Sequence, residues 1–312
     1  MDKIFIQIAS YRDPQCGPTI QDLINKAQNP ERLSFGVCLQ WMFEDTEETL
    51  SCGPESLPNW PTLRLKTVHA KDSKGTCWAR AKCQSLWHGE AFTLQIDSHM
   101  RAEPDWDALI TSHWQQLNNQ KGILSCYPNG FTITPEQTIA YSRERLPLMA
   151  AKAFGDDGLL RLQGISKYPI PDGLPRTPPN GAFISAGMLF APSGILEDTP
   201  YDPHLYFYGE ESSYAARLWT AGYDLYNPHR PLLYHLYKTA VDRGATHWQD
   251  HANWSDLNKR AITRARNLLN CRDDLGPYGL GSERSMADYQ AWSGINFAAQ
   301  TIQQHALDGL FG

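Results

Sequence analysis

The sequence predicts an α/β protein, with a mostly parallel central sheet flanked by helices and a small helical C-terminal extension. Short apolar, β-rich segments at 4–8, 33–39, 63–68 and 91–96 are separated by helical or loop-forming stretches. From about residue 258 the pattern turns helical. Alternation of strands and helices is typical of parallel sheets, because each parallel connection needs a crossover. The segment 91–96 is mostly apolar, which favours a central position in the sheet.

Capping residues and periodicity predict the remaining elements. Thr19 is the expected N-cap of a helix that follows the first strand. Another helix is expected at 78–87, and Gly222 is expected to end a later helix. The polar stretch 44–61 is expected to be a loop. Further helices are expected at 106–117 and 211–221, and further strands at 122–127, 183–190 and 232–237.

Domain organisation follows from where the composition changes. We expect a main domain over residues 1–239 and a helical C-terminal extension over residues 240–312. Within the main domain, residues 128–182 are rich in Pro and Gly. We expect this stretch to be an insertion of loops with short strands.

The composition excludes several classes of protein. With 41% hydrophobic and 20% charged residues in 312, the chain is globular, and a net charge of −6 gives no reason to expect nucleic-acid binding. It contains no run of 18 apolar residues, so no membrane span is expected. The apolar stretch at the start of the chain is too short for a signal peptide, and polar residues interrupt it too early. Seven cysteines without a CxxC pair indicate a reducing, cytoplasmic location.

The strongest chemical signal is an acidic residue at the end of an apolar strand. Asp97 follows the strand directly, and His99 stands two positions later. Residues i and i+2 at a strand end can point the same way, so both side chains can meet on one divalent cation. The mixed oxygen and nitrogen ligands favour Mn²⁺ over Mg²⁺, which is the alternative ion. The competing interpretation is that Asp97 only caps the following turn.

Three weaker signals lie elsewhere in the chain. His235 sits in an apolar strand, and Lys238 follows it; a metal with a lysine would neutralise a diphosphate leaving group. Glu210 and Glu211 are expected at the start of a helix. Either they are there because the helix dipole favours acids at this end, or one of them faces a pocket. The basic stretch 71–82 is either a solvated helix face or a phosphate site. No GxGxxG follows the first strand and no GxxxxGK[ST] occurs, which weakens dehydrogenase and P-loop interpretations.

Several short segments, taken in order along nearly the whole chain, together resemble one known class of protein. They are Ile8–Asp13, Cys77–Arg80, Leu94–Met100, Ser185–Gly187, Gly209–Glu211, Ala215–Trp219, Tyr234–Tyr237, Tyr278–Gly281 and Asp288–Tyr289. These segments resemble a metal-dependent glycosyltransferase of the GT-A type. The chain is most similar to the polypeptide α-N-acetylglucosaminyltransferase family, which modifies hydroxyproline, Ser or Thr, and more distantly to the polypeptide GalNAc-transferases.

The resemblance implies a role for each matching residue. Asp97, His99 and His235 would bind Mn²⁺, with Asp97 also counted as catalytic. Glu210 would bind hydroxyls of the donor sugar, and Glu211 is the second candidate for this role. The resemblance does not decide which of the two faces the pocket. The residues implied in binding the donor, UDP-GlcNAc, are Ala9, Tyr11, Arg12, Arg80, Ser98, Ala186, Gly187 and Lys238.

The implied reaction retains the anomeric configuration and transfers GlcNAc to a polypeptide hydroxyl. A phosphate oxygen of the leaving UDP would help take the acceptor proton, so no protein base is required. Residues 128–182 would shape the acceptor site. The alternatives are a GT-A transferase with another UDP-hexose or a glycan or small-molecule acceptor, and a catalytically silent nucleotide-sugar-binding module. A metal-dependent hydrolase would be expected to have a denser cluster of ligands or a carboxylate pair.

Overall fold

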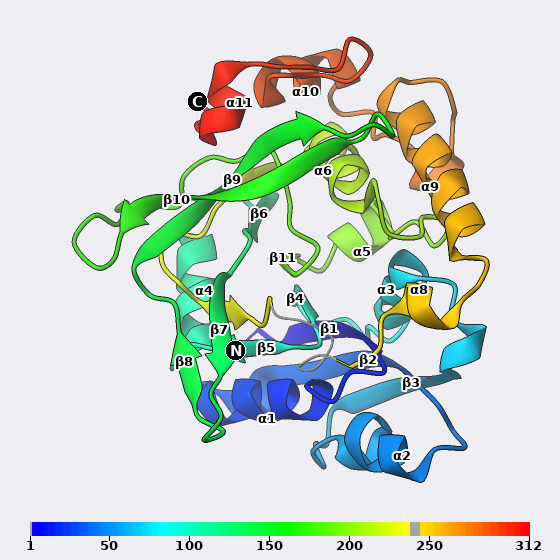
Figure 1. Cartoon of the computed structure of the whole chain (residues 1–312). Coiled ribbons are helices and arrows are strands. Elements are labelled where there is room, and N and C mark those ends of the chain that lie inside the picture. The colour runs from blue at the N-terminus through cyan, green and yellow to red at the C-terminus, as the bar shows by residue number, and fades with distance from the viewer. Residues whose placement is uncertain (1, 238–243) are drawn as a thin grey trace.

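The computed structural model describes residues 2–237 and 244–312, and its largest element is a central sheet of seven strands (Figure 1). Their order in the sheet is β12-β6-β11-β4-β1-β2-β3. Only the strand next to last in sequence, β11, runs antiparallel to its two neighbours, so the predicted mostly parallel α/β sheet is confirmed. The strands are β1 (Ile4–Tyr11), β2 (Leu33–Trp41), β3 (Leu63–His69), β4 (Phe92–Asp97), β6 (Gly122–Ser125), β11 (Met188–Pro192) and β12 (Asp224–Tyr226).

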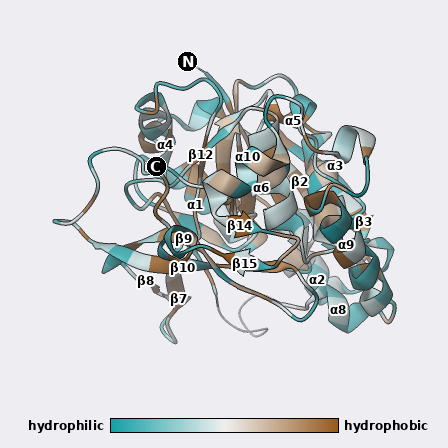
Figure 2. Ribbon diagram, turned by 90° about the horizontal axis from the view of Figure 1, so that it is seen from above, coloured by the Kyte–Doolittle hydropathy of each residue, from teal (hydrophilic) through white to brown (hydrophobic). Residues whose placement is uncertain are grey.

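Helices cover both faces of this sheet, because the strands bury apolar side chains on both sides. On one face Ile6 and Ile8 of β1 pack with Ile20 of α1 and Trp106 of α4. On the other face Phe5 of β1 belongs to a second cluster that includes residues of α6. Figure 2 shows hydrophobic colour concentrated in the strands at the middle of the molecule. The helices in this part of the chain are α1 (Cys16–Lys26), α2 (Thr46–Cys52), α3 (Thr76–Gln84), α4 (Trp106–Gln115), α5 (Ile195–Asp198) and α6 (Glu210–Thr220).

Two smaller sheets lie beside the central one. One has four strands in the order β5-β13-β7-β8, and it joins β13 antiparallel to β5 and parallel to β7. The other is a hairpin of β9 and β10, which Figure 1 shows crossing the molecule below α10 and α11. These strands are β5 (Met100–Ala102), β7 (Asn129–Ile133), β8 (Ile139–Tyr141), β9 (Arg145–Phe154), β10 (Leu160–Pro169) and β13 (Leu233–His235).

The hairpin corrects the expectation of loops with short strands over residues 128–182. Both of its strands are ten residues long. Its stability comes from distant contacts that local Pro and Gly content does not reveal: Leu148 and Ala151 are fully buried, and β9 packs against α11 near the end of the chain. The predicted role of this stretch in shaping an acceptor site stays a prediction.

The C-terminal part is mostly helical, with a short two-stranded sheet. Ala265 and Tyr289 are buried in the same apolar cluster as Leu218 of α6, so this part contributes to the core of the main fold. In residues 2–237 and 244–312, no helix is both long enough and apolar enough to cross a membrane. The elements are α8 (His247–Asp250), α9 (Trp254–Leu269), α10 (Met286–Ser293), β14 (Ile295–Asn296), β15 (Thr301–Ile302) and α11 (Gln304–Asp308).

Three local expectations are corrected. The stretch 44–61 contains α2, because the Asp45 side chain accepts hydrogen bonds from two backbone N–H groups at its start. The strand expected at 183–190 begins only at Met188. Thr19 is not an N-cap but lies inside α1, and its hydroxyl donates to the Ser98 carbonyl over 2.8 Å and accepts from the Met100 N–H.

Candidate active site

The two predicted metal-ligating histidines are brought together by the pairing of β5 with β13. His235 ends β13 and pairs with Met100, which directly follows His99. As a result the Nε2 atoms of His99 and His235 are 3.1 Å apart. The His235 Nε2 also lies 3.1 Å from Oδ2 of Asp97 at the end of β4. One side-chain atom from each of these three residues lies within 4.8 Å of the other two.

This donor set fits a divalent metal ion. Two imidazole nitrogens and a carboxylate oxygen converge, which suits Mn²⁺ or a similar transition ion. Burial alone would raise the pKa of Asp97, but the hydrogen bond from His235 and the positive charge of Arg80 outweigh it, so this pKa lies well below its usual range. Asp97 is therefore ionised at neutral pH and available as a ligand.

Asp13 is a site residue to which sequence reasoning assigned no role. Its buried carboxylate accepts a hydrogen bond from Nδ1 of His99 over 2.6 Å and another from the Ser98 hydroxyl over 2.6 Å. Since a carboxylate only accepts, Nδ1 of His99 carries the proton and Nε2 presents its lone pair to the ligand cluster. Its position was the available signal: Asp13 follows the carboxyl end of β1, beside the end of β4.

A buried ion-pair network lies behind the metal-ligating residues. Nη2 of Arg80 is 2.9 Å from Oδ1 of Asp97, and its Nε is 2.8 Å from Oε1 of Glu210. The Tyr201 hydroxyl donates to the same Glu210 oxygen over 2.5 Å. Burial raises the pKa of Glu210, while Arg80 and Tyr201 oppose that rise without cancelling it. Glu210 is thus buried and paired with Arg80 and Tyr201.

Glu211 has neutral partners and is more exposed than its neighbour. Its Oε1 accepts from the Ala186 N–H over 2.9 Å, and Tyr127 donates a short hydrogen bond to its Oε2. Burial raises the pKa of Glu211 to about 7, and the nearby charge of Glu210 adds to the rise. Glu211 is partly exposed whereas Glu210 is buried, so Glu211 is the more accessible of the two acids.

These side chains line a cavity of about 570 Å³. Gly187 has no room for a side chain, because a Cβ there would lie 2.8 Å from Oδ2 of Asp97. Gln95 holds the adjacent loop by donating to the Ala186 carbonyl over 2.9 Å. The predicted residues that line the cavity are Ala9, Tyr11, Arg80, Asp97, Ser98, His99, Ala186, Gly187, Glu210, Glu211 and His235.

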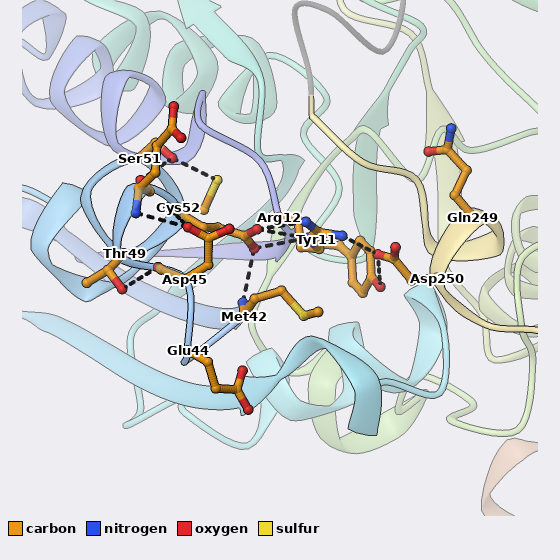
Figure 3. A network of polar contacts seen from close by, with 12 residues as sticks. Tyr11, Arg12, Met42, Glu44, Asp45, Thr49, Ser51, Cys52, Gln249 and Asp250 are labelled. Atoms are coloured by element: carbon orange, nitrogen blue, oxygen red, sulfur yellow. Dashed lines mark hydrogen bonds and ion pairs between the residues drawn. The ribbon is translucent and has the colours of Figure 1, made fainter.

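Of the predicted donor-binding residues that the structure describes, Arg12 is placed differently. Arg12 is not among the described residues that line the cavity; its guanidinium lies 2.8 Å from both Glu48 and Asp250. Figure 3 shows Tyr11 and Arg12 pointing toward Asp250 of α8, where the Tyr11 hydroxyl donates over 2.7 Å. Lys238 lies outside the described residues. The donor-binding roles of both basic residues stay predictions.

Comparison with known families decides the class of protein. The model of the family described as "Glycosyltransferase (GlcNAc)" matches residues 3–58 and 56–299. The chain belongs to this glycosyltransferase family. No curated protein matches the sequence significantly.

The solved structure of GalNAc-T7 supports the fold of this glycosyltransferase. The crystal structure of GalNAc-T7 with UDP, GalNAc and Mn²⁺ is similar with a TM-score of 0.61 and 14% identity, over 94% of this chain. The match covers 57% of the GalNAc-T7 chain. A structure of S. aureus TarS 1–349 in complex with UDP is also similar, with a TM-score of 0.47, 11% identity, and coverage of 92% of this chain and 68% of that one. The GT-A type of fold predicted from the sequence is confirmed.

Proposed function

We propose that this glycosyltransferase transfers GlcNAc from UDP-GlcNAc to a hydroxyl group of a polypeptide, on Ser, Thr or hydroxyproline, with retention of configuration. The observation that carries the proposal is the convergence of Asp97, His99 and His235 at the wall of a cavity of about 570 Å³. The family match supports the GlcNAc donor. GalNAc-T7, which shares the fold, was solved with UDP and Mn²⁺, and this supports a UDP-sugar and that ion.

In this proposal, Asp97, His99 and His235 hold Mn²⁺, and Asp13 orients His99. The bound ion supplies Lewis acidity that stabilises negative charge on a diphosphate leaving group. Ala9 and Tyr11, at the end of β1, lie against the uridine. Arg80 and Ser98 support the diphosphate side, as Lys238 does in the sequence-based prediction, and Ala186 and Gly187 leave room for the sugar ring.

Glu211 is the acid we assign to the donor sugar, because it is the more accessible of the pair. Its carboxyl accepts hydrogen bonds from sugar hydroxyls, while Glu210 keeps Arg80 in place. In the transfer, the bond from the anomeric carbon to the UDP oxygen breaks and UDP keeps the electron pair. The acceptor oxygen forms the new bond on the same face, and its proton passes to a phosphate oxygen of UDP.

The domain assignment and the location belong to the same proposal. Residues 1–239 form the catalytic domain, 128–182 shape the acceptor site, and 240–312 are the C-terminal extension. We place the reaction in the cytoplasm. All seven cysteines lie in the described part of the chain and are free, which is usual in a reducing compartment.

The test is UDP release from a panel of UDP-sugars with and without Mn²⁺, with no acceptor added. We expect slow hydrolysis confined to UDP-GlcNAc, lost on chelation and restored by Mn²⁺. Hydrolysis of another UDP-hexose instead would contradict the donor. No release from any donor, together with no thermal shift by UDP and Mn²⁺, would contradict the enzyme and leave a silent member of the family.

A further inference from the structure

A second cavity opens directly beside the proposed donor cavity. It has a volume of about 450 Å³ and shares Tyr127, Pro128 and Tyr237 with its neighbour. Tyr127 contacts Glu211, so the second cavity starts next to the acid assigned to the donor sugar. We call it the lateral groove and define it by Tyr127, Asn129, Gly130, Ser142, Gly164 and Ser166.

Strand β10 runs from one cavity into the other. Leu162 lines the donor cavity, whereas Gly164 and Ser166 line the lateral groove. These alternate residues share one face of the strand, because side chains alternate with a period of two. Between Leu162 and Ser166 the strand advances about 13 Å, at roughly 3.3 Å per residue. Together, this end of the donor cavity and the lateral groove are therefore long enough for about four residues of an extended chain.

The strands contain glycines of two kinds. A Cβ on Gly36 of β2 would lie 2.4 Å from the Phe5 ring, and one on Gly122 of β6 would lie 2.6 Å from Leu117. Packing therefore explains these two glycines. For Gly130 of β7 and Gly164 of β10, the nearest atom would be 3.6 Å and 3.5 Å away, an ordinary contact. Neither of them has a positive φ.

Neither packing nor backbone conformation thus requires glycine at 130 or 164, although glycine in a strand costs about 0.5–1 kcal/mol relative to alanine. Both glycines line the lateral groove. Glycine inside a strand often marks a place where a ligand or another backbone approaches closely. In the lateral groove, the backbone is therefore not covered by a side chain at Gly130 of β7 and at Gly164 of β10.

We propose that the lateral groove binds the acceptor as an extended polypeptide segment whose backbone lies against Gly130 and Gly164. This inference rests on the proposed function. The hydroxyl to be modified lies at the Tyr127 end, beside Glu211, and the flanking residues run along β10 toward Ser166. A single sugar or other small acceptor would occupy only one end of the path from Leu162 to Ser166.

The test uses the full chain and a peptide library with a central Ser, Thr or hydroxyproline and random flanking residues. Gly164→Ala and Gly130→Ala add one methyl group to the groove. The matched control is Gly194→Ala at the start of α5, where φ is −53°. Among the described residues, the nearest atom to a new Cβ there is the Tyr223 hydroxyl oxygen, 3.9 Å away. Donor hydrolysis, melting temperature and the KM for the most reactive library peptides are measured for each.

We expect both groove variants to raise the peptide KM at least tenfold and to leave hydrolysis of UDP-GlcNAc and the melting temperature at or above wild-type values. The control variant should match wild type throughout. Unchanged peptide KM in both groove variants would overturn the groove and leave the proposed function standing. Donor hydrolysis without modification of any peptide, or transfer to oligosaccharides instead, would overturn the polypeptide as the occupant.

Discussion

Two walls of the proposed donor cavity hold carboxylates in different electrostatic surroundings. On the metal wall, defined by Asp13, Arg80, Asp97, His99 and His235, each acid faces an imidazole or a guanidinium. On the second wall, defined by Tyr127, Ala186 and Glu211, the acid faces a hydroxyl and a backbone N–H. The first wall suits the binding of a cation, and the second leaves an acid that changes charge near neutral pH.

Glu210 and Glu211 show that a shift of one residue along a helix is enough to move a carboxylate from one of these surroundings to the other. They are adjacent at the start of α6, but successive residues of a helix point in different directions. Glu210 therefore joins Arg80 of the metal wall, while Glu211 lies on the second wall. Neighbouring residues of one type thus acquire different roles, and substitutions on the two walls should have different effects.

The largest effect is expected on the metal wall, from Asp97→Asn. Removing the only charged ligand should reduce Mn²⁺-dependent UDP release by on the order of 10³-fold, equivalent to about 4 kcal/mol. Asp256→Asn, an exposed position on α9, is the matched control and should be normal. UDP release and Mn²⁺ binding by electron paramagnetic resonance check this. Normal Mn²⁺ binding by the Asp97→Asn variant would disprove the metal assignment.

The second prediction compares the two glutamates directly. Glu210→Gln removes one partner of a buried ion pair with Arg80, so the free energy of unfolding should fall by about 3 kcal/mol. Glu211→Gln keeps neutral hydrogen bonds to Tyr127 and Ala186, so its change should stay within about 1 kcal/mol. Urea unfolding measures both. Equal losses in the two variants would mean that the walls do not differ as described.

The third prediction concerns the residue behind His99. Asp13→Ala should weaken Mn²⁺ binding by roughly 10- to 100-fold, because His99 loses the acceptor that sets its orientation. Asp13→Asn retains an acceptor oxygen and should recover part of the affinity. Calorimetric titration with Mn²⁺ measures the three proteins. If Asp13→Ala folds normally and binds Mn²⁺ like wild type, Asp13 has no positioning role.

The smallest effect is a pH dependence on the second wall, at Glu211. The pKa of Glu211 is raised from 4.5 to about 7 in the folded protein, so the folded state binds this proton more tightly than the unfolded state. That contribution to stability is present at low pH and is lost as the pH rises through about 7. The melting temperature of Glu211→Gln relative to wild type should therefore rise by a few degrees between pH 5 and pH 8. A constant difference would contradict the raised pKa.

Regions governed by local pattern were predicted well. The strands at 4–8 and 91–96 follow from apolar runs, and the polar residues after the second strand led directly to Asp97 and His99. The helix after the first strand was also expected, although Thr19 is not its N-cap. The hairpin of β9 and β10 was missed, because it is stabilised by pairing and by packing against α11, more than 130 residues further along the chain. Local composition in 128–182 suggested loops instead.

The sequence by itself determined the α/β class, the mostly parallel sheet and three candidate metal ligands, Asp97, His99 and His235, which the structure brings within 4.8 Å of one another. Strand and helix periodicity and the position of acids at strand ends are local properties, so they can be recognised in the sequence alone. Only the tertiary structure decided that Asp13 orients His99, that Arg80 is paired with Glu210, and that Glu211 is the accessible acid. Each of these depends on contacts between segments far apart in the chain, whose distance and burial set the charge and direction of a side chain.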